Sequence, residues 1–141
     1  MIEKEKVGEW RSYKECNLSG TYYVQSINDN FKGLQINLYA EDEKSNVTIK
    51  FEDNVYAYRS IEESYNLKLI NTLTAKYGDE FFMNNKTLYR VKNTDYIKEF
   101  CNSSLKIIEE SQIFQFSIIA ADYFIDIITD YEPEILIEYK N

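Results

Sequence analysis

The sequence predicts an α+β fold, in which an antiparallel meander of about four strands is followed by three helices that alternate with further strands. Two observations predict it. In the first half of the chain, apolar residues alternate with polar residues, which is the period of a half-buried strand. After Ser60 the apolar residues recur at helical spacing, and turn or capping residues separate the segments. With 141 residues, the chain is expected to form a single globular domain, 1–141, in which residues 1–20 are a candidate peripheral segment.

Four short segments of the first half predict the strands of the meander. In one of them, Leu34, Ile36 and Leu38 alternate with polar residues, so one side of the strand is expected to be buried. The connections between the segments are short and rich in turn residues, and short connections join antiparallel neighbours. The predicted strands are Thr21–Ile27, Leu34–Leu38, Val47–Phe51 and Val55–Arg59.

Three helices and three further strands are predicted after residue 60. Ser60 and Glu63 form a capping-box pattern, in which each side chain can bond the backbone amide of the other residue. The apolar residues from Tyr65 to Tyr77 then fall on one helical face, and Gly78 ends this helix. The remaining predicted elements are a strand at Thr87–Val91, a helix capped by Asn93-Thr94, a strand at Ile113–Ile119, a helix at Ala121–Tyr131 and a strand at Glu134–Tyr139. The order of the strands within a sheet is not predicted.

The composition excludes several classes of site. The chain has no histidine, which excludes imidazole bases, Ser-His and Cys-His nucleophile pairs, and histidine-ligated metals. Its two cysteines, Cys16 and Cys101, are too few for a disulfide framework or a four-thiolate zinc site. Cys101 lies on the apolar face of its helix and is expected to be buried. We therefore expect no metal and no other cofactor, and no motif indicates a catalytic residue.

No segment of the sequence indicates a membrane or a secretory pathway. The N-terminus is charged and lacks an apolar run behind it. The most apolar stretch, Ile113–Ile128, is too short and too polar to span a bilayer. These features predict a cytoplasmic protein with no membrane partner.

The negative charge of the protein is concentrated in the last quarter of the chain. The net charge is −8, and residues 109–141 contain eight acids against one base, Lys140. This balance disfavours direct binding of nucleic acid and steers positively charged partners toward the segment. We therefore predict that these acids bind a basic protein partner; they are Glu109, Glu110, Asp122, Asp126, Asp130, Glu132, Glu134 and Glu138.

Three of these acids are spaced four residues apart in the third predicted helix. On a helix, Asp122, Asp126 and Asp130 would form a narrow acidic ridge opposite the apolar face, and Glu134 and Glu138 would extend it from the last strand. Like charges at this spacing destabilise a helix by ~0.2–0.5 kcal/mol per pair, a cost that solubility alone does not require. The ridge is therefore predicted to be a docking surface, and the alternative is a solvated face with no binding role.

Caps, turns and core positions between about residues 34 and 137 form a set of short motifs. The motifs are Tyr58-Arg59-Ser60, Leu67-Lys68, Tyr77-Gly78 with Phe81, Val91-Lys92-Asn93-Thr94 with Tyr96, and Tyr131-Glu132-Pro133. In these motifs the chain resembles a family of small cytoplasmic proteins of Gram-positive bacteria, some of which are regarded as immunity proteins of polymorphic toxins. The resemblance implies a protein that binds and neutralises a cognate toxin, and it implies no catalytic residue.

These observations predict a non-enzymatic binding protein, an immunity- or antitoxin-like inhibitor that docks its acidic residues on a basic partner such as a nuclease toxin. Three alternatives stay open. A nucleic-acid mimic would share the charge but needs carboxylates spaced like phosphates. A small enzyme would use some of the carboxylates, although the chain has no glycine-rich loop to hold a phosphate. The third is a structural or regulatory subunit; the partner and the oligomeric state are not predicted.

Overall fold

The computed structural model describes residues 7–13, 18, 20–52, 55–83 and 86–140. Within them the chain has nine strands in two antiparallel sheets and three α-helices, which confirms the predicted α+β fold. The strands are β1 (Glu9–Ser12), β2 (Tyr22–Asn30), β3 (Gly33–Ala40), β4 (Ser45–Phe51), β5 (Val55–Glu62), β6 (Leu88–Lys92), β7 (Phe114–Ile119), β8 (Tyr123–Thr129) and β9 (Glu134–Tyr139). The helices are α1 (Leu67–Tyr77), α2 (Glu80–Met83) and α3 (Asp95–Ser103), with short 3-10 helices η1 (Glu63–Tyr65) and η2 (Glu110–Gln112). No helix in the described ranges has the length and apolarity needed to cross a membrane.

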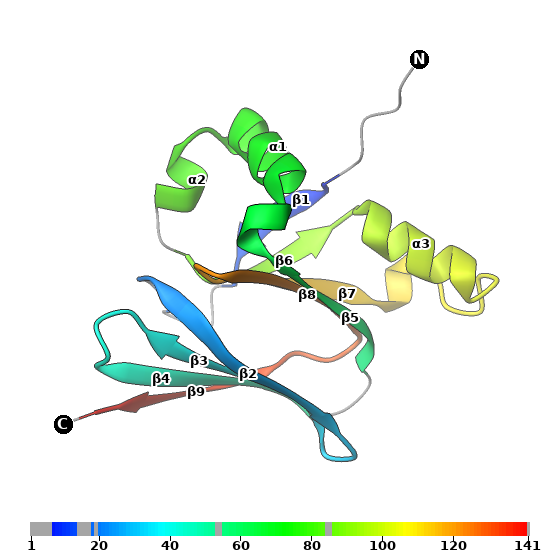
Figure 1. Cartoon of the computed structure of the whole chain (residues 1–141). Coiled ribbons are helices and arrows are strands. Elements are labelled where there is room, and N and C mark those ends of the chain that lie inside the picture. Colours follow the sequence, from blue (N-terminus) through cyan, green and yellow to red (C-terminus); the bar gives the residue numbers. More distant parts are fainter. Residues whose placement is uncertain (1–6, 14–17, 19, 53–54, 84–85, 141) are drawn as a thin grey trace.

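The two sheets lie face to face, and the helices cover only one of them (Figure 1). The five-stranded sheet has the order β1-β6-β7-β8-β5, and the four-stranded sheet has the order β2-β3-β4-β9. All three α-helices lie on the side of the five-stranded sheet that faces away from the four-stranded sheet. In the described part of the chain, the outer face of the four-stranded sheet therefore stays open.

The main core lies between the sheets, because each strand turns alternate side chains inward. Ile36 from the four-stranded sheet and Phe116 from the five-stranded sheet are both fully buried there. Two smaller clusters join the helices to the other face of the five-stranded sheet, with Leu73 from α1 and Cys101 from α3. The predicted burial of Cys101 is thus confirmed, whereas Cys16 lies outside the described residues.

The N-terminal meander is confirmed for β2, β3 and β4, which are sequential antiparallel neighbours. The fourth predicted strand forms as β5, but β5 pairs with β8 in the other sheet, and β9 takes the place beside β4. The physical reason lies in β8, which is buried on both faces and, as a central strand, needs a neighbour on each edge.

The helix predicted at Ala121–Tyr131 is wrong, because the segment forms β8. All residues from Phe124 to Thr129 are buried. Ile125 and Ile127 belong to the core between the sheets, whereas Ile128 packs in the cluster under α3. A short apolar run fits a central strand as well as a buried helix, and its isoleucines favour the strand.

Local capping chemistry explains the start of α3 and the end of α1. Thr94 caps α3 as predicted, since its hydroxyl oxygen accepts a hydrogen bond from the Ile97 amide at 3.1 Å. Gly78 ends α1 as predicted, with a φ of 83° that favours glycine. The predicted capping box does not start the helix, because Ser60 belongs to β5 and α1 begins at Leu67.

Within the predicted peripheral segment, 1–20, the residues Glu9–Ser12 form β1, an edge strand of the five-stranded sheet. Trp10 of β1 is 7% exposed, because its indole packs against Phe81 and Tyr89. The end of α1 covers the free edge of β1, where the Tyr77 hydroxyl accepts a hydrogen bond from the Trp10 amide at 2.9 Å. This strand is therefore protected from pairing with another chain.

Candidate functional site

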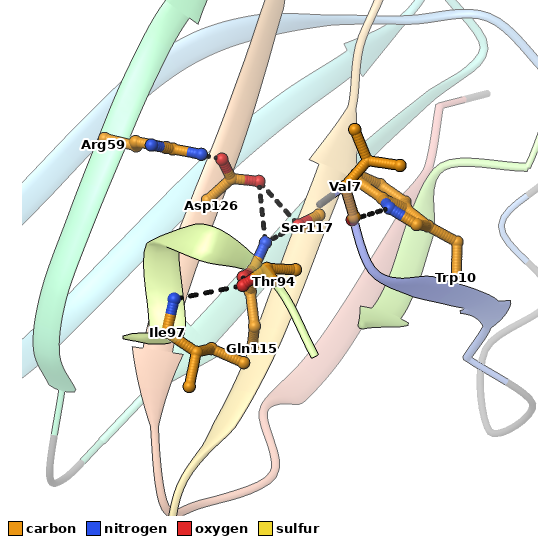
Figure 2. Close-up of polar contacts among 8 residues, drawn as sticks. All are labelled: Val7, Trp10, Arg59, Thr94, Ile97, Gln115, Ser117 and Asp126. Atoms are coloured by element: carbon orange, nitrogen blue, oxygen red, sulfur yellow. Dashed lines mark hydrogen bonds and ion pairs between the residues drawn. The ribbon is translucent and has the colours of Figure 1, made fainter. Parts of the chain in front are cut away.

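Asp126, the middle residue of the predicted ridge, lies in a buried polar network on the helix side of β8. Its carboxylate accepts a hydrogen bond from Arg59 Nε at 2.8 Å and another from the Ser117 hydroxyl at 2.6 Å. Figure 2 shows the carboxylate between these two groups. Because Asp126 is 5% exposed and forms an ion pair with Arg59, it is not available to a docking partner.

The same network ties the start of α3 to the five-stranded sheet. From β7, the Gln115 amide group donates to the Ser117 hydroxyl at 2.9 Å and to Asp126 at 3.3 Å. The Gln115 side-chain oxygen accepts a hydrogen bond from Thr94, the cap of α3, at 2.5 Å (Figure 2). Because these buried groups satisfy one another, the network stabilises the packing of α3 on the sheet.

Arg59 is the exposed end of this network. Its side chain is 41% exposed, and its guanidinium carbon lies 4.0 Å from the centre of the Tyr96 ring. Burial raises the pKa of Tyr96, and the neighbouring Arg59 charge opposes that rise. The Ser117 hydroxyl, which lies beside the Asp126 carboxylate, is fully buried.

The outer two acids of the predicted ridge lie at opposite ends of β8. Asp122, before the strand, accepts a hydrogen bond from the Val24 amide at 3.0 Å. Asp130, after the strand, accepts one from the Tyr56 hydroxyl at 2.9 Å, and this bond raises the pKa of Tyr56. A strand rises about 3.3 Å per residue, which places the two aspartates about 26 Å apart. The acidic ridge predicted on a helix is therefore wrong.

Glu109 and Glu110 are exposed at the start of η2, beside α3. They line a hollow of about 480 Å³ together with Lys98 and Lys106, so bases from earlier in the chain lie near these acids. Burial raises the pKa of the neighbouring Cys101, and the charges of Glu110 and Glu109 add to the rise. The surface here has mixed charge rather than a purely negative potential.

Glu134 and Glu138 are the two predicted site residues that share an open surface. Both lie on β9 and are exposed on the outer face of the four-stranded sheet, where they flank Leu136. Leu136 is 58% exposed. Their neighbours across the ladder are Lys50 and Asn46 of β4. Neither glutamate forms an ion pair with another described residue.

β9 is also an edge of its sheet. It pairs with β4 alone among the described strands, so one side of its backbone is open. On the β4 side, the Lys140 amide donates a hydrogen bond to the Lys44 carbonyl. Because ladder bonds alternate in an antiparallel pair, Ile135, Ile137 and Tyr139 turn their N–H and C=O groups to the open side. The sequence predicted this strand but not its edge position, since strand order is not visible in a local pattern.

The open face beside β9 is polar, and its side chains bond to one another. Asn37 of β3 lies at the centre, where it donates to the Ser26 hydroxyl at 2.8 Å. Its side-chain oxygen accepts hydrogen bonds from Gln35 and from Thr48, each at 3.1 Å. The period-two pattern of Leu34–Leu38 indicated that Gln35 and Asn37 share a face. The face next to β9 therefore holds its side chains in fixed positions.

Glu132, the last of the eight acids, is exposed before β9 and lines a different hollow, with basic residues of β1 and β6. The eight predicted residues thus do not form one surface: Glu109 and Glu110 line one hollow, and Glu134 and Glu138 share the open face of β9. No group of three or more acids or thiols in the described part of the chain is arranged to hold a metal ion.

The resemblance of the short motifs to immunity proteins stays a prediction, and the function is inferred from the residues themselves. Comparisons of the chain with protein-family models, with curated proteins and with solved structures found no match.

Proposed function

We propose that this protein is a non-enzymatic binding protein whose β9 edge takes up an extended, basic segment of a partner protein. Glu134 and Glu138 attract the basic side chains, and the open backbone of β9 pairs with the partner strand. Following the resemblance to immunity proteins, the partner is a toxin such as a nuclease, whose basic cleft is occluded on binding.

The observation that carries the proposal is the open edge of β9. Unpaired strand edges template pairing with another chain, and soluble proteins normally cover or shorten them. Here the edge runs over six residues, Glu134–Tyr139, whereas α1 covers the edge of β1. Main-chain hydrogen bonds to such an edge give affinity, and alternate side chains give specificity.

The charges on β9 favour a basic partner over a second copy of this chain. In an antiparallel self-pairing centred on Leu136, Glu134 of one copy would lie opposite Glu138 of the other. Like charges directly opposite each other destabilise a strand pair. A partner strand with Lys or Arg at those positions gains attraction instead, and it associates faster. The exposed Leu136 supplies an apolar contact between the two charged positions.

The positions of the acids do not support the nucleic-acid mimic. A row of carboxylates spaced like phosphates would have to be exposed and regular. Asp126 is buried, and Asp122 and Asp130 lie at the two ends of β8, each bonded to a neighbouring residue. The binding of a basic strand needs only the two glutamates that share the face of β9.

A peptide-binding measurement tests the proposal with a defined probe. The probe is a fluorescein-labelled peptide of alternating Lys and Val, long enough to span β9, and the comparison peptide has Glu in place of each Lys. We expect the Lys peptide to bind and to shift the NMR signals of the Ile135, Ile137 and Tyr139 amides, which face the open edge. The Glu peptide should not bind. Binding of the Lys peptide that leaves these amides unchanged would exclude the edge as the site.

Charge-reversal variants supply a matched control. The β9 variant carries Glu134→Lys with Glu138→Lys. The control variant carries Glu109→Lys with Glu110→Lys, which changes the net charge by the same amount at a different place on the surface. Two exposed ion pairs contribute about 0.4–2 kcal/mol, and the new lysines repel the peptide. The β9 variant should therefore weaken binding of the Lys peptide about tenfold, and the control less than about twofold. Equal losses in the two variants would indicate attraction by net charge alone and would contradict docking on β9.

A further inference from the structure

A hollow of about 290 Å³ lies beside β1 and β6, and the proposed function does not use it. It is lined by Arg11 of β1, Arg90 and Lys92 of β6, and by Glu9, Tyr13 and Glu132. Three cations gathered in one hollow are unexpected in a protein with a net charge of −8. Within the part of the chain that the structure describes, none of the three has a carboxylate within ion-pair distance.

The two arginines of this hollow lie directly opposite each other. Arg11 is the partner of Arg90 in the register of the β1–β6 pair, so both side chains are on the same face of the sheet. Like charges directly opposite each other destabilise a sheet. An anion bound between the two guanidinium groups would convert this repulsion into attraction.

Arg90 is oriented by an aromatic ring. Its guanidinium carbon lies 4.0 Å from the centre of the Phe114 ring, a stacking contact that restrains the plane of the group. Its Nε is buried and has no hydrogen-bond acceptor among the described residues. A buried donor without an acceptor destabilises the fold, so an oxyanion that reached this nitrogen would stabilise the protein.

We propose that the hollow binds the oxyanion group of a small ligand, a carboxylate or a phosphate, between Arg11 and Arg90. A planar guanidinium donates paired hydrogen bonds to two oxygens of such a group. The volume is at the low end for ligand sites, which suits a small molecule. Glu9 lies opposite Lys92 in the ladder and offsets its charge, and Glu132 adds a negative charge, so polyanions such as nucleic acid are disfavoured.

The Nε–H signals of the arginines report on this site by NMR. The protein is titrated with sodium phosphate, with sodium acetate, and with sodium chloride at matched ionic strength, and the first two probes identify the preferred oxyanion. We expect saturable shifts of the Arg11 and Arg90 signals with phosphate or acetate. Arg59 Nε, which already donates to Asp126, should keep its signal. Shifts no larger than those in chloride would overturn the proposal.

Arg11→Gln gives a second, independent test. Arg11 is exposed, and its removal relieves the repulsion with Arg90, so the midpoint of thermal unfolding without anion should rise by about 1–3 °C. The same variant should bind the preferred oxyanion about tenfold more weakly or worse, because a charged hydrogen-bond donor is lost.

Lys98→Gln is the matched control for Arg11→Gln, since it removes one positive charge from the hollow beside α3. Its oxyanion affinity should stay within about twofold of that of the unsubstituted protein. The proposed site would be contradicted if the Arg11→Gln variant were less stable than the unsubstituted protein and bound the oxyanion with the same affinity.

Discussion

The five-stranded sheet is covered on both faces, by the helices and by the other sheet, whereas the four-stranded sheet is covered on one face only (Figure 1). Asp126 of the covered sheet is 5% exposed, and its carboxylate has three donors. Glu138 of the open sheet is exposed and has no ion pair among the described residues. These two acids are twelve residues apart in the sequence. The sheet in which an acid lies therefore decides whether the acid stabilises the protein or is available to a partner.

One edge strand of each sheet, β1 and β9, shows the same difference. On β1, the Trp10 amide donates to the Tyr77 hydroxyl, and just before the strand the Gly8 carbonyl accepts a hydrogen bond from Lys76 Nζ at 2.7 Å. On β9, the open edge has two glutamates on its exposed face and no covering element in the described part of the chain. Contacts within the chain cover the edge of β1, whereas only the charges of its glutamates disfavour pairing of the β9 edge with another copy.

The largest expected effect on stability comes from Asp126→Ala. The substitution removes the acceptor of the buried Ser117 hydroxyl and Gln115 amide and the ion-pair partner of Arg59. We expect the free energy of unfolding to fall by about 3–5 kcal/mol, measured by urea denaturation. Glu134→Ala on β9 is the matched control, because it also removes one carboxylate. It should change the free energy of unfolding by less than about 0.5 kcal/mol.

A double variant separates the network from simple packing. In Asp126→Ala the buried Ser117 hydroxyl loses its acceptor, which destabilises the protein. The double variant Ser117→Ala with Asp126→Ala should therefore lose less free energy of unfolding than the two single variants lose in sum. Strict additivity would show that the two groups are not coupled. Equal small losses for Asp126→Ala and Glu134→Ala would remove the contrast between the covered and the open sheet.

The second effect concerns alkaline pH and the helix side of the covered sheet. Tyr89 is 5% exposed, and burial raises its pKa to about 12. An unfolded tyrosine titrates near 10, so between about pH 10 and 12 the native state keeps a proton that the unfolded chain has released. Stability should therefore fall as the pH rises through this window, by about 2 kcal/mol from this group.

Urea unfolding from pH 9 to 12 measures this loss. Tyr89→Phe removes the titrating phenol and should flatten the decline in that window. Tyr139→Phe is the matched change at a 78% exposed position on β9, and its profile should follow that of the unsubstituted protein. A Tyr89→Phe profile as steep as the unsubstituted one would assign the alkaline loss to other groups.

The sequence predicted the elements whose signals are local. Alternation at Leu34, Ile36 and Leu38 identified β3, because one face of that strand is buried and the other is open. Thr94 and Gly78 identified helix ends, because a cap needs only the residues of one turn. On the open sheet, this local pattern also placed the polar face correctly.

The sequence did not predict the features that depend on distant partners. Arg59 and Asp126 are 67 residues apart, and no local pattern pairs them. In β8, burial on both faces removed the alternation that identifies a strand. A signal was available in the charge of Asp126 between Ile125 and Ile127, because a carboxylate inside a buried run requires a partner. The position of β9 at the sheet edge depends on strand order, which the sequence left open.

The smallest expected effect on stability is that of Glu134→Thr with Glu138→Thr, and it tests whether charge guards the open edge. Threonine suits an exposed strand, so the free energy of unfolding should change by less than about 0.5 kcal/mol. Without the like charges, β9 should pair with a second copy, and sedimentation velocity should show a dimer that grows with concentration. Adding Ile137→Pro removes an edge N–H and should abolish the dimer. If Glu109→Thr with Glu110→Thr dimerises equally, net charge rather than the β9 glutamates keeps the copies apart, and the contrast between the two edges fails.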